Sequence, residues 1–299
     1  MSYNTETINV QFLNQAFLDK VDSGMTKEAG VAMSAFVRQK LREDGFTRKI
    51  LEPIMVTAAE LDRQLTEEPT IIVEKEPDSV AANLPFLGRP EPRYFTGERY
   101  AVTFTKIQSD EFKKSKFELA TYRTDIRTVL QENSVKDLQK QEDQNFYGNI
   151  YAIAQANNNV YTIGAALDVK TLMTAVQKML AKQLPVNCLL MTHTTYSNLL
   201  KQPATQLGSG LASDMTLGAF NLDNFFGFKI ITTNKNDIVP DNQVLIFTAP
   251  QYLGQMYLLQ DATVFLKTEA DMIQFTTYEA LGIGIGNVNG VCIANFVAG

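Results

Sequence analysis

Few side chains in this sequence have the type and spacing that catalysis or metal binding requires. His193 is the one histidine, and no second histidine or cysteine lies where it could share a metal ion with it. Zinc and redox metals need several such ligands close together. A single histidine at the end of a predicted strand is usually structural. We therefore expect neither a metal site nor a cofactor.

Three kinds of short motif look superficially functional. The run Gly282–Gly286 has the glycine spacing of a dinucleotide loop, but no predicted helix follows it to receive a phosphate. We interpret it as strand glycines that permit close approach of another backbone segment. Gly208–Gly210 lies in a predicted irregular loop, and the acidic pairs Glu67–Glu68 and Glu142–Asp143 are interpreted as solvated surface. The sequence thus predicts no active site and no enzyme.

Composition narrows the function classes further. The chain has 299 residues, 45% of them hydrophobic, and a formal net charge of −6, which argues against a nucleic-acid reader with a basic face. No apolar run approaches the ~18 residues of a membrane helix, and the polar N-terminus lacks a signal-peptide pattern. Cys188 and Cys292 each lie in an apolar run, so we expect buried free thiols and synthesis in a reducing cytoplasm.

The charged residues are distributed unevenly along the chain. Residues 46–116 contain 23 charged side chains in 71 positions, whereas residues 161–261 contain 12 in 101. The first segment is therefore expected to be solvent-exposed and extended, and the second segment is expected to be compact.

The element that organises the chain is a long helix predicted over Tyr122–Ala156. The segment has no proline, is rich in good helix formers, and repeats apolar residues at steps of three and four. A coiled coil is disfavoured because only Val135 and Leu138 are apolar between Gln131 and Asn145. Two shorter helices broken near Asn133–Ser134 remain an open alternative.

A long charged excursion precedes this helix. Strands are predicted at Thr70–Glu76 and Tyr100–Ile107, and the segment between them is dense in proline and glycine. Such a loop is improbable within a compact domain unless it lies on something else. Its apolar tip favours a partner surface, although a tip that folds back on its own domain remains possible. The apolar tip residues are Leu84, Phe86, Leu87, Tyr94 and Phe95.

The remaining pattern predicts an α/β unit followed by strands. Between residues 160 and 260, strands alternate with helices, including one capped by Asp168 and one over residues 195–201, with a small-residue loop at Gln202–Thr216. Residues 262–299 are almost uncharged and strand-like, and we expect the long helix to cover the sheet they form. Shorter helices are predicted at Met25–Asp44 and, less strongly patterned, at Ala58–Leu65.

This order of elements resembles the major capsid protein of tailed bacteriophages, with the HK97-like fold. The resemblance covers residue 46 to the end and rests on arrangement and diffuse local patterns. The long helix, with FYGN at Phe146–Asn149, resembles the spine helix of the peripheral domain, and Thr70–Ile107 resembles the extended E-loop. Residues 189–202, 225–237 and 244–258 are similar to the axial domain, and residues 263–296 to the return strands.

The resemblance implies an α+β fold with five segments. They are an N-terminal arm at 1–45, an E-loop region at 46–116, the peripheral domain with the spine helix at 117–160, the α/β axial domain at 161–261, and the return strands of the peripheral domain at 262–299.

The function that the resemblance implies is structural. Pentamers and hexamers of the chain would build an icosahedral shell around double-stranded DNA, without sequence-specific binding and without a membrane. The Gln202–Thr216 loop would lie near a capsomer axis, and Leu84, Phe86, Tyr94 and Phe95 would contact a neighbouring subunit. The N-terminal segment is too short for a built-in scaffold, so we expect a separate scaffold or a trimmed precursor. A portal and decoration proteins are further partners, and the location is the virion, assembled in the host cytoplasm.

Three alternatives stay open at this point. The first is an encapsulin-like compartment shell with the same fold, which would enclose protein rather than DNA. The second is an enzyme with an undetected polar site around His193, and the third is another virion component such as a decoration or tail protein.

Overall fold

We analysed a computed structural model of the whole chain. The structure describes residues 19, 23–25, 45–61, 68–74, 81, 83–86, 88–89, 92, 97–117, 134–200, 224–225 and 227–297. The predicted helix at Met25–Asp44, the first part of the long helix before residue 134, and the Gln202–Thr216 loop lie almost entirely outside these ranges.

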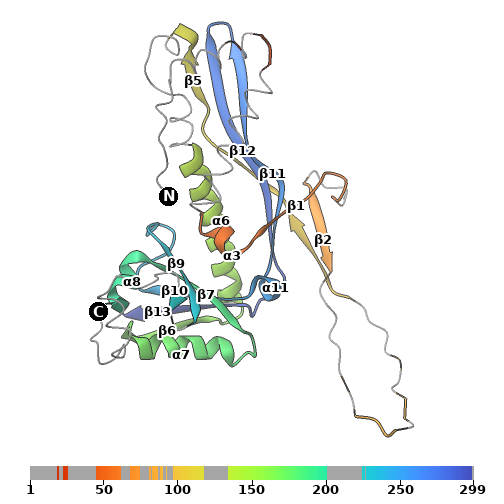
Figure 1. Cartoon of the computed structure of the whole chain (residues 1–299), viewed down its shortest axis with the longest axis vertical. Helices are drawn as coiled ribbons and strands as arrows, with labels where there is room; N and C mark the ends of the chain where they lie inside the picture. Colours follow the sequence, from red (N-terminus) through yellow and green to blue (C-terminus); the bar gives the residue numbers. More distant parts are fainter. Residues whose placement is uncertain are drawn as a thin grey trace, which may run out of the picture.

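A mixed six-stranded sheet forms the compact end of the molecule (Figure 1). Its strand order is β6-β13-β10-β7-β9-β8, with parallel pairs at β13–β6 and β7–β9 and antiparallel pairs elsewhere. The strands are β6 Val160–Ala166, β7 Val186–Thr192, β8 Asn224–Phe225, β9 Phe228–Thr233, β10 Gln243–Thr248 and β13 Val291–Val297.

Both faces of this sheet are buried, which explains its nearly continuous apolar sequence. Leu189, Val244 and Ile246 face the core formed with α7 (Val169–Leu180) and α8 (His193–Leu200). Leu190 and Leu245 face the opposite core. Helix α7 begins as predicted, because the Asp168 side chain accepts a hydrogen bond from the Thr171 amide in a capping box.

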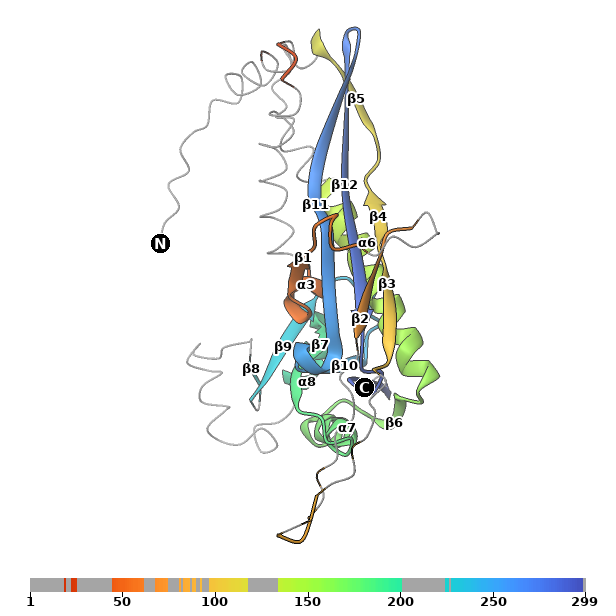
Figure 2. The same ribbon diagram turned by 90° about the vertical axis from the view of Figure 1, so that its right-hand side faces the viewer.

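A second sheet is built on a long antiparallel ribbon that projects away from the compact end (Figures 1 and 2). The ribbon consists of β11 Gly254–Glu269 and β12 Met272–Ile285, and the short helix α11 Pro250–Leu253 leads into it. Strand β1 Pro53–Met55 pairs in parallel with β11, while β4 Thr105–Gln108 and β5 Phe112–Ser115 pair with successive parts of β12.

Helix α6 joins the two sheets. It spans Val135–Ala156 and packs its apolar stripe into a core shared by β10, β11, β12 and the short helix α3 Thr47–Ile50. Phe146 lies at the centre of this core, with its ring centroid 6.4 Å from that of Phe46 and 6.0 Å from that of Phe247. The described part of the predicted long helix is therefore confirmed, and it covers both sheets rather than one.

Two sequence expectations about the strands need correction. The predicted strand Tyr100–Ile107 is two strands, because β3 Arg99–Thr103 pairs with β2 Thr70–Glu74, whereas β4 pairs with β12. The chain changes partner at Phe104, whose amide donates to the Pro69 carbonyl at 3.0 Å. The C-terminal strands also do not share a sheet, since β13 pairs with β10 and β6 while β12 pairs with β11.

Smaller differences concern the short elements. The sequence does not predict helix α3 or strand β1. Residues 58–61 form turns and bends where the sequence predicts a helix over Ala58–Leu65, and residues 62–65 lie outside the described ranges. Helix α7 ends at Leu180, four residues earlier than its apolar stripe, because Gln183 takes a left-handed backbone with φ 60°.

Candidate functional site

The projecting hairpin is the first candidate for a functional surface. Strands β2 and β3 form a two-stranded sheet of their own, and residues 75–98 connect them. Of the four residues predicted to contact another subunit, Leu84 is 45% exposed and Phe86 is 103% exposed. Tyr94 and Phe95 lie outside the described residues. The two described members of the set therefore present apolar surface to solvent.

The base of the hairpin packs closely on β12. Val102 and Phe104 form a small core with Tyr257 of β11. A Cβ atom at Gly284 would lie 2.6 Å from Val102 Cγ2, and one at Gly282 would lie 3.0 Å from Val102 Cγ1. The interpretation of the glycine run as strand residues that permit close approach is thus confirmed, and the run does not form a dinucleotide loop.

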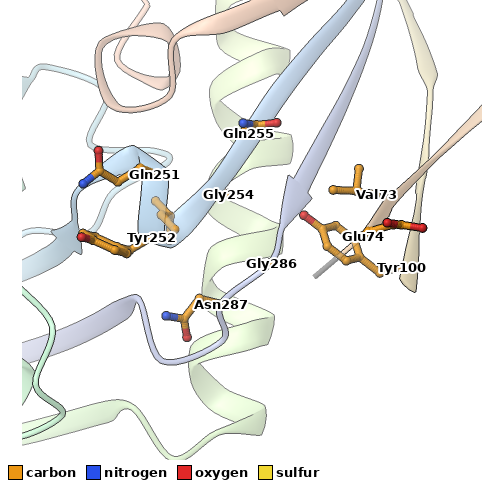
Figure 3. A pocket seen from close by; sticks show the side chains of 10 residues that line it. Val73, Glu74, Tyr100, Gln251, Tyr252, Gly254, Gln255, Gly286 and Asn287 are labelled. Atoms are coloured by element: carbon orange, nitrogen blue, oxygen red, sulfur yellow. The ribbon is translucent and has the colours of Figure 1, made fainter. Parts of the chain in front are cut away.

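A pocket of about 420 Å³ lies beside this contact. In Figure 3, Gln251 and Tyr252 come from α11 on one side, while Val73, Glu74 and Tyr100 come from the hairpin on the other. The pocket thus lies where the hairpin base meets the start of the ribbon. Its lining mixes amide, phenol and carboxylate groups without a nucleophile and base in contact.

A buried ionic cluster around Arg48 is the second candidate. The Arg48 guanidinium donates from Nε to Glu142 Oε2 at 3.1 Å, from Nη1 to Asp261 Oδ1 at 3.2 Å and from Nη2 to Glu279 Oε2 at 3.0 Å. All four side chains are at most 2% exposed. One cation is therefore surrounded by three carboxylates in the interior.

Asp143 extends the cluster on the next position of α6. Its Oδ1 accepts from the Thr47 amide at 3.1 Å and from the Thr47 hydroxyl at 2.7 Å, and its Oδ2 accepts from Lys235 Nζ at 2.5 Å. Asp143 thus caps the start of α3 from outside the helix. The Glu142–Asp143 pair, interpreted from sequence as solvated surface, is buried, and that interpretation is wrong.

Four elements bring the cluster together. Arg48 comes from α3, Glu142 from α6, Asp261 from β11 and Glu279 from β12. Asp261 lies in a part of β11 where the register with β12 shifts between Leu258 and Thr263. Such an irregularity in a strand changes the direction of a side chain relative to regular alternation.

Burial decides the ionisation of these carboxyls. Burial, opposed by the attraction of Arg48, raises the pKa of Glu142 to about 7. Burial together with the charge of Glu142 raises the pKa of Glu279 to about 8. Near neutral pH the cluster therefore holds a proton on a carboxyl group, which is otherwise ionised in water.

The apolar periodicity of the sequence contains a signal for this cluster. Leu138, Glu142, Phe146 and Ile150 follow one another at steps of four, so Glu142 occupies a core position of the α6 stripe. Phe275, Glu279 and Leu281 likewise fall on the inward face of β12. A carboxylate on an apolar stripe needs a buried cation.

The one histidine and the two cysteines belong to no metal-binding group among the described residues. His193 is the exposed first residue of α8. Cys188 and Cys292 are buried free thiols, as predicted, and burial raises their pKa values to about 12 and about 11. Within the described ranges no group of three or more His, Cys, Asp or Glu residues could hold a metal ion. No described helix is both long and apolar enough to cross a membrane.

Comparisons with known proteins identify the fold. A chain of Microbacterium phage Oxtober96 matches with a TM-score of 0.61 and 14% identity over 85% of this chain and 92% of that one. The capsid structure of cyanophage P-SCSP1u matches with a TM-score of 0.56 and 12% identity over 83% and 87%. The virus-like particle from Pyrococcus furiosus matches with a TM-score of 0.55 and 17% identity over 88% and 98%.

No family model and no curated protein matches the sequence itself. The structural matches nevertheless extend over most of both chains in each pair. The chain therefore has the α+β architecture of phage capsid proteins, and the HK97-like fold expected from the sequence is confirmed.

Proposed function

We propose that this chain is the major capsid protein of a tailed phage, which assembles through pentamers and hexamers into an icosahedral shell around the genome. The observation that carries the proposal is the fold shared with a phage chain over 85% of this chain and 92% of that one. The role is structural rather than catalytic.

The five segments read from the sequence belong to this proposal. They are the N-terminal arm at 1–45, the E-loop region at 46–116, the peripheral domain at 117–160, the axial domain at 161–261 and the return strands at 262–299. The strand pairings refine two borders, because β11 runs through residue 261 and β13 pairs with β10 and β6. We therefore propose that β13 belongs with the axial domain.

The hairpin tip is proposed to contact a neighbouring subunit through Leu84, Phe86, Tyr94 and Phe95. The exposure of Leu84 and Phe86 supports this proposal, since an apolar tip gains stability when a partner covers it. Each contact can be weak, because closure of a shell multiplies the contacts that each subunit makes.

The charge of the chain fits a container. A net charge of −6 repels packaged DNA instead of binding it, so a genome can move while it is packed. The proposed partners are copies of the chain, a separate scaffold, a portal, and decoration proteins. The proposed location is the virion, with assembly in the host cytoplasm.

A second candidate is an encapsulin-like compartment that encloses protein. The match to the virus-like particle from Pyrococcus furiosus favours it, because that match covers 98% of the archaeal chain. The two candidates share the shell and differ in its contents.

Electron microscopy of the purified protein tests both, with the protein expressed alone and together with the products of neighbouring genes. Closed shells, or rings of five and six subunits, support the shell. Nucleic acid inside the shells indicates a phage capsid, whereas protein inside them indicates a compartment. A monodisperse monomer under all these conditions overturns the proposal.

A further inference from the structure

The ionic cluster holds more acid than base. Four carboxyl groups, on Glu142, Asp143, Asp261 and Glu279, surround two cations, Arg48 and Lys235. Glu142, Asp143 and Glu279 alone already outnumber Arg48 and Lys235, so full ionisation would leave buried negative charge uncompensated. Isolated buried charges are costly enough that such groups take up a proton instead.

The hydrogen bonds indicate where a proton resides. Arg48 satisfies only one oxygen of Glu279, namely Oε2, and Oε1 is buried without a hydrogen-bond partner among the described residues. A carboxylate oxygen in that position would be both charged and unsolvated. A protonated Glu279 carboxyl has the same shape as the carboxylate but carries no charge.

We propose that the Arg48 cluster is a proton-loaded latch, which fixes residues 45–56 to α6 and to the β11–β12 ribbon while a proton is bound and releases them when it leaves. The inference concerns the single subunit and does not depend on the proposed shell.

The geometry shows what the latch holds. Arg48 and Thr47 of α3 make all the described polar contacts between this segment and the cluster, and β1 follows α3 along the edge of β11. Phe46, Ile50 and Leu51 pack on α6 and the sheets around it. Loss of the polar contacts leaves a short segment held by these apolar side chains, by β1 and by Val56, whose amide donates to the Leu258 carbonyl at 2.8 Å.

Few charged side chains of the described elements packed against Glu279 face it from outside the cluster. Strand β4 contributes Lys106, whose Nζ lies 4.1 Å from the centre of the Tyr278 ring instead of entering the cluster. The other charged groups are those of the cluster itself: Arg48 of α3, Glu142 and Asp143 of α6, Asp261 of β11, and Lys235 after β9. Among the described residues, Arg48 and Lys235 are the cations within ion-pair distance of Glu142, Asp143 and Glu279.

The direction of the pH response follows from linkage. In the closed state the pKa of Glu279 is about 8 and that of Glu142 about 7, whereas in the open, hydrated state both return toward 4.5. Between these limits, opening releases protons. Opening therefore becomes about tenfold more favourable per pH unit for each proton released, and the latch weakens as the pH rises.

Hydrogen exchange of the full chain tests the latch. We expect the protection factor of amides in residues 45–56, corrected for intrinsic exchange, to fall by about tenfold to about a hundredfold per pH unit from pH 5.5 to 7, because opening releases protons from both Glu142 and Glu279. Amides of β7 serve as an internal reference, because they lie in the other sheet. Equal protection of residues 45–56 across pH 5.5 to 8.5, relative to β7, overturns the proposal.

Two variants sharpen the test. Glu279→Gln keeps the shape of the side chain but cannot ionise, so it should make the decline shallower by about tenfold per pH unit and leave residues 45–56 better protected than in the wild type at pH 8.5. Glu269→Gln is the matched control, because Glu269 lies exposed on the same ribbon beside Lys267, and its decline should equal that of the wild type. A decline in Glu279→Gln as steep as in the wild type also overturns the latch.

Discussion

Arg48 Nη2 and Glu279 Oε2 lie 3.0 Å apart in the interior, although 231 positions separate the two residues in the sequence. This ion pair ties α3, near the start of the described chain, to the ribbon strand that precedes the C-terminal strand. Glu142 of α6 and Asp261 of β11 contact the same guanidinium. The position of α6 between the two sheets is thus fixed by one side chain as well as by apolar packing.

Replacement of this side chain should be costly. In Arg48→Met the apolar stem is retained, but three buried carboxylates lose their cation, and removal of one partner from a buried ionic cluster costs roughly 3–5 kcal/mol. We expect a loss of that size in the free energy of unfolding, measured with urea at pH 7. Lys49→Met is the control, because Lys49 is exposed and adjacent, and it should change stability by less than about 0.5 kcal/mol. Similar stability of the two variants would show that Arg48 contributes no more than a surface lysine.

The pH dependence of overall stability is the second prediction. Because the carboxyls of Glu142 and Glu279 have raised pKa values in the folded state, the folded chain binds more protons than the unfolded chain between about pH 4.5 and 8. Stability should therefore be greatest near pH 5.5 and fall toward pH 8.5, by up to about 1.4 kcal/mol per pH unit for each proton.

Urea unfolding at pH 5.5, 7 and 8.5 measures this loss, and Glu142→Gln should reduce it. Glu60→Gln should leave it unchanged, since hydrogen bonds from Thr57 lower the pKa of the exposed Glu60 and move its titration below this window. Stability that rises between pH 5.5 and 8.5 would contradict the assigned direction.

Much of the local structure was predictable, because it depends on patterns within a few residues. Residues 262–299, which are strand-like in sequence, contain the end of β11 and the strands β12 and β13, and strands alternate with helices before them as expected. The start of α7 was also predictable, since Asp168 and Thr171 cap it from three residues apart. Apolar alternation and capping are local signals, and in these elements the tertiary contacts favour the same secondary structure.

Partner choice was not predictable in the same way. The break at Phe104 exists because β3 and β4 pair with different strands, and the pattern of residues 100–107 alternates smoothly through it. Strand β13 follows β12 after a short turn, yet it inserts between β6 and β10. The burial of Glu142 depends on Arg48, which lies 94 positions away. These features depend on long-range contacts that a single sequence does not reveal directly.

The close approach of the hairpin base to the ribbon gives a third prediction. In Gly284→Ala the new Cβ would lie 2.6 Å from Val102 Cγ2, and overpacking of this kind costs roughly 1–3 kcal/mol. Val102→Ala removes the clashing methyl groups, so the double variant should lose less stability than the sum of the two single losses. A coupling energy of at least about 1 kcal/mol is expected in the double-mutant cycle.

Gly164→Ala is the control for this cycle, because a Cβ at Gly164 meets nothing within 4 Å. It should leave the free energy of unfolding almost unchanged. Additive losses for Gly284→Ala and Val102→Ala would mean that the contact between β3 and β12 tolerates a methyl group, contrary to the geometry.

The exposed hairpin tip gives the last prediction, which bears on assembly rather than on folding. In Phe86→Asp combined with Phe95→Asp, two apolar side chains of the proposed contact become charged, and burial of an unpaired carboxylate in an interface is strongly unfavourable. The subunit should unfold at the same urea concentration as the wild type, because Phe86 is fully exposed and contributes little to the core. Shell growth, followed by light scattering and electron microscopy, should stop.

Asn83→Asp separates the effect of charge from the loss of the apolar contact. Asn83 is exposed and lies beside Leu84, so this variant adds one negative charge to the tip while both phenylalanines remain. It should still form particles at 0.1 M ionic strength, because the field of an exposed charge is screened within about 10 Å there. At lower salt the particles should form at most more slowly. Normal particles from the double aspartate variant would show that the tip does not contact a neighbouring subunit, whereas failure of both variants would indicate charge repulsion rather than a lost apolar contact.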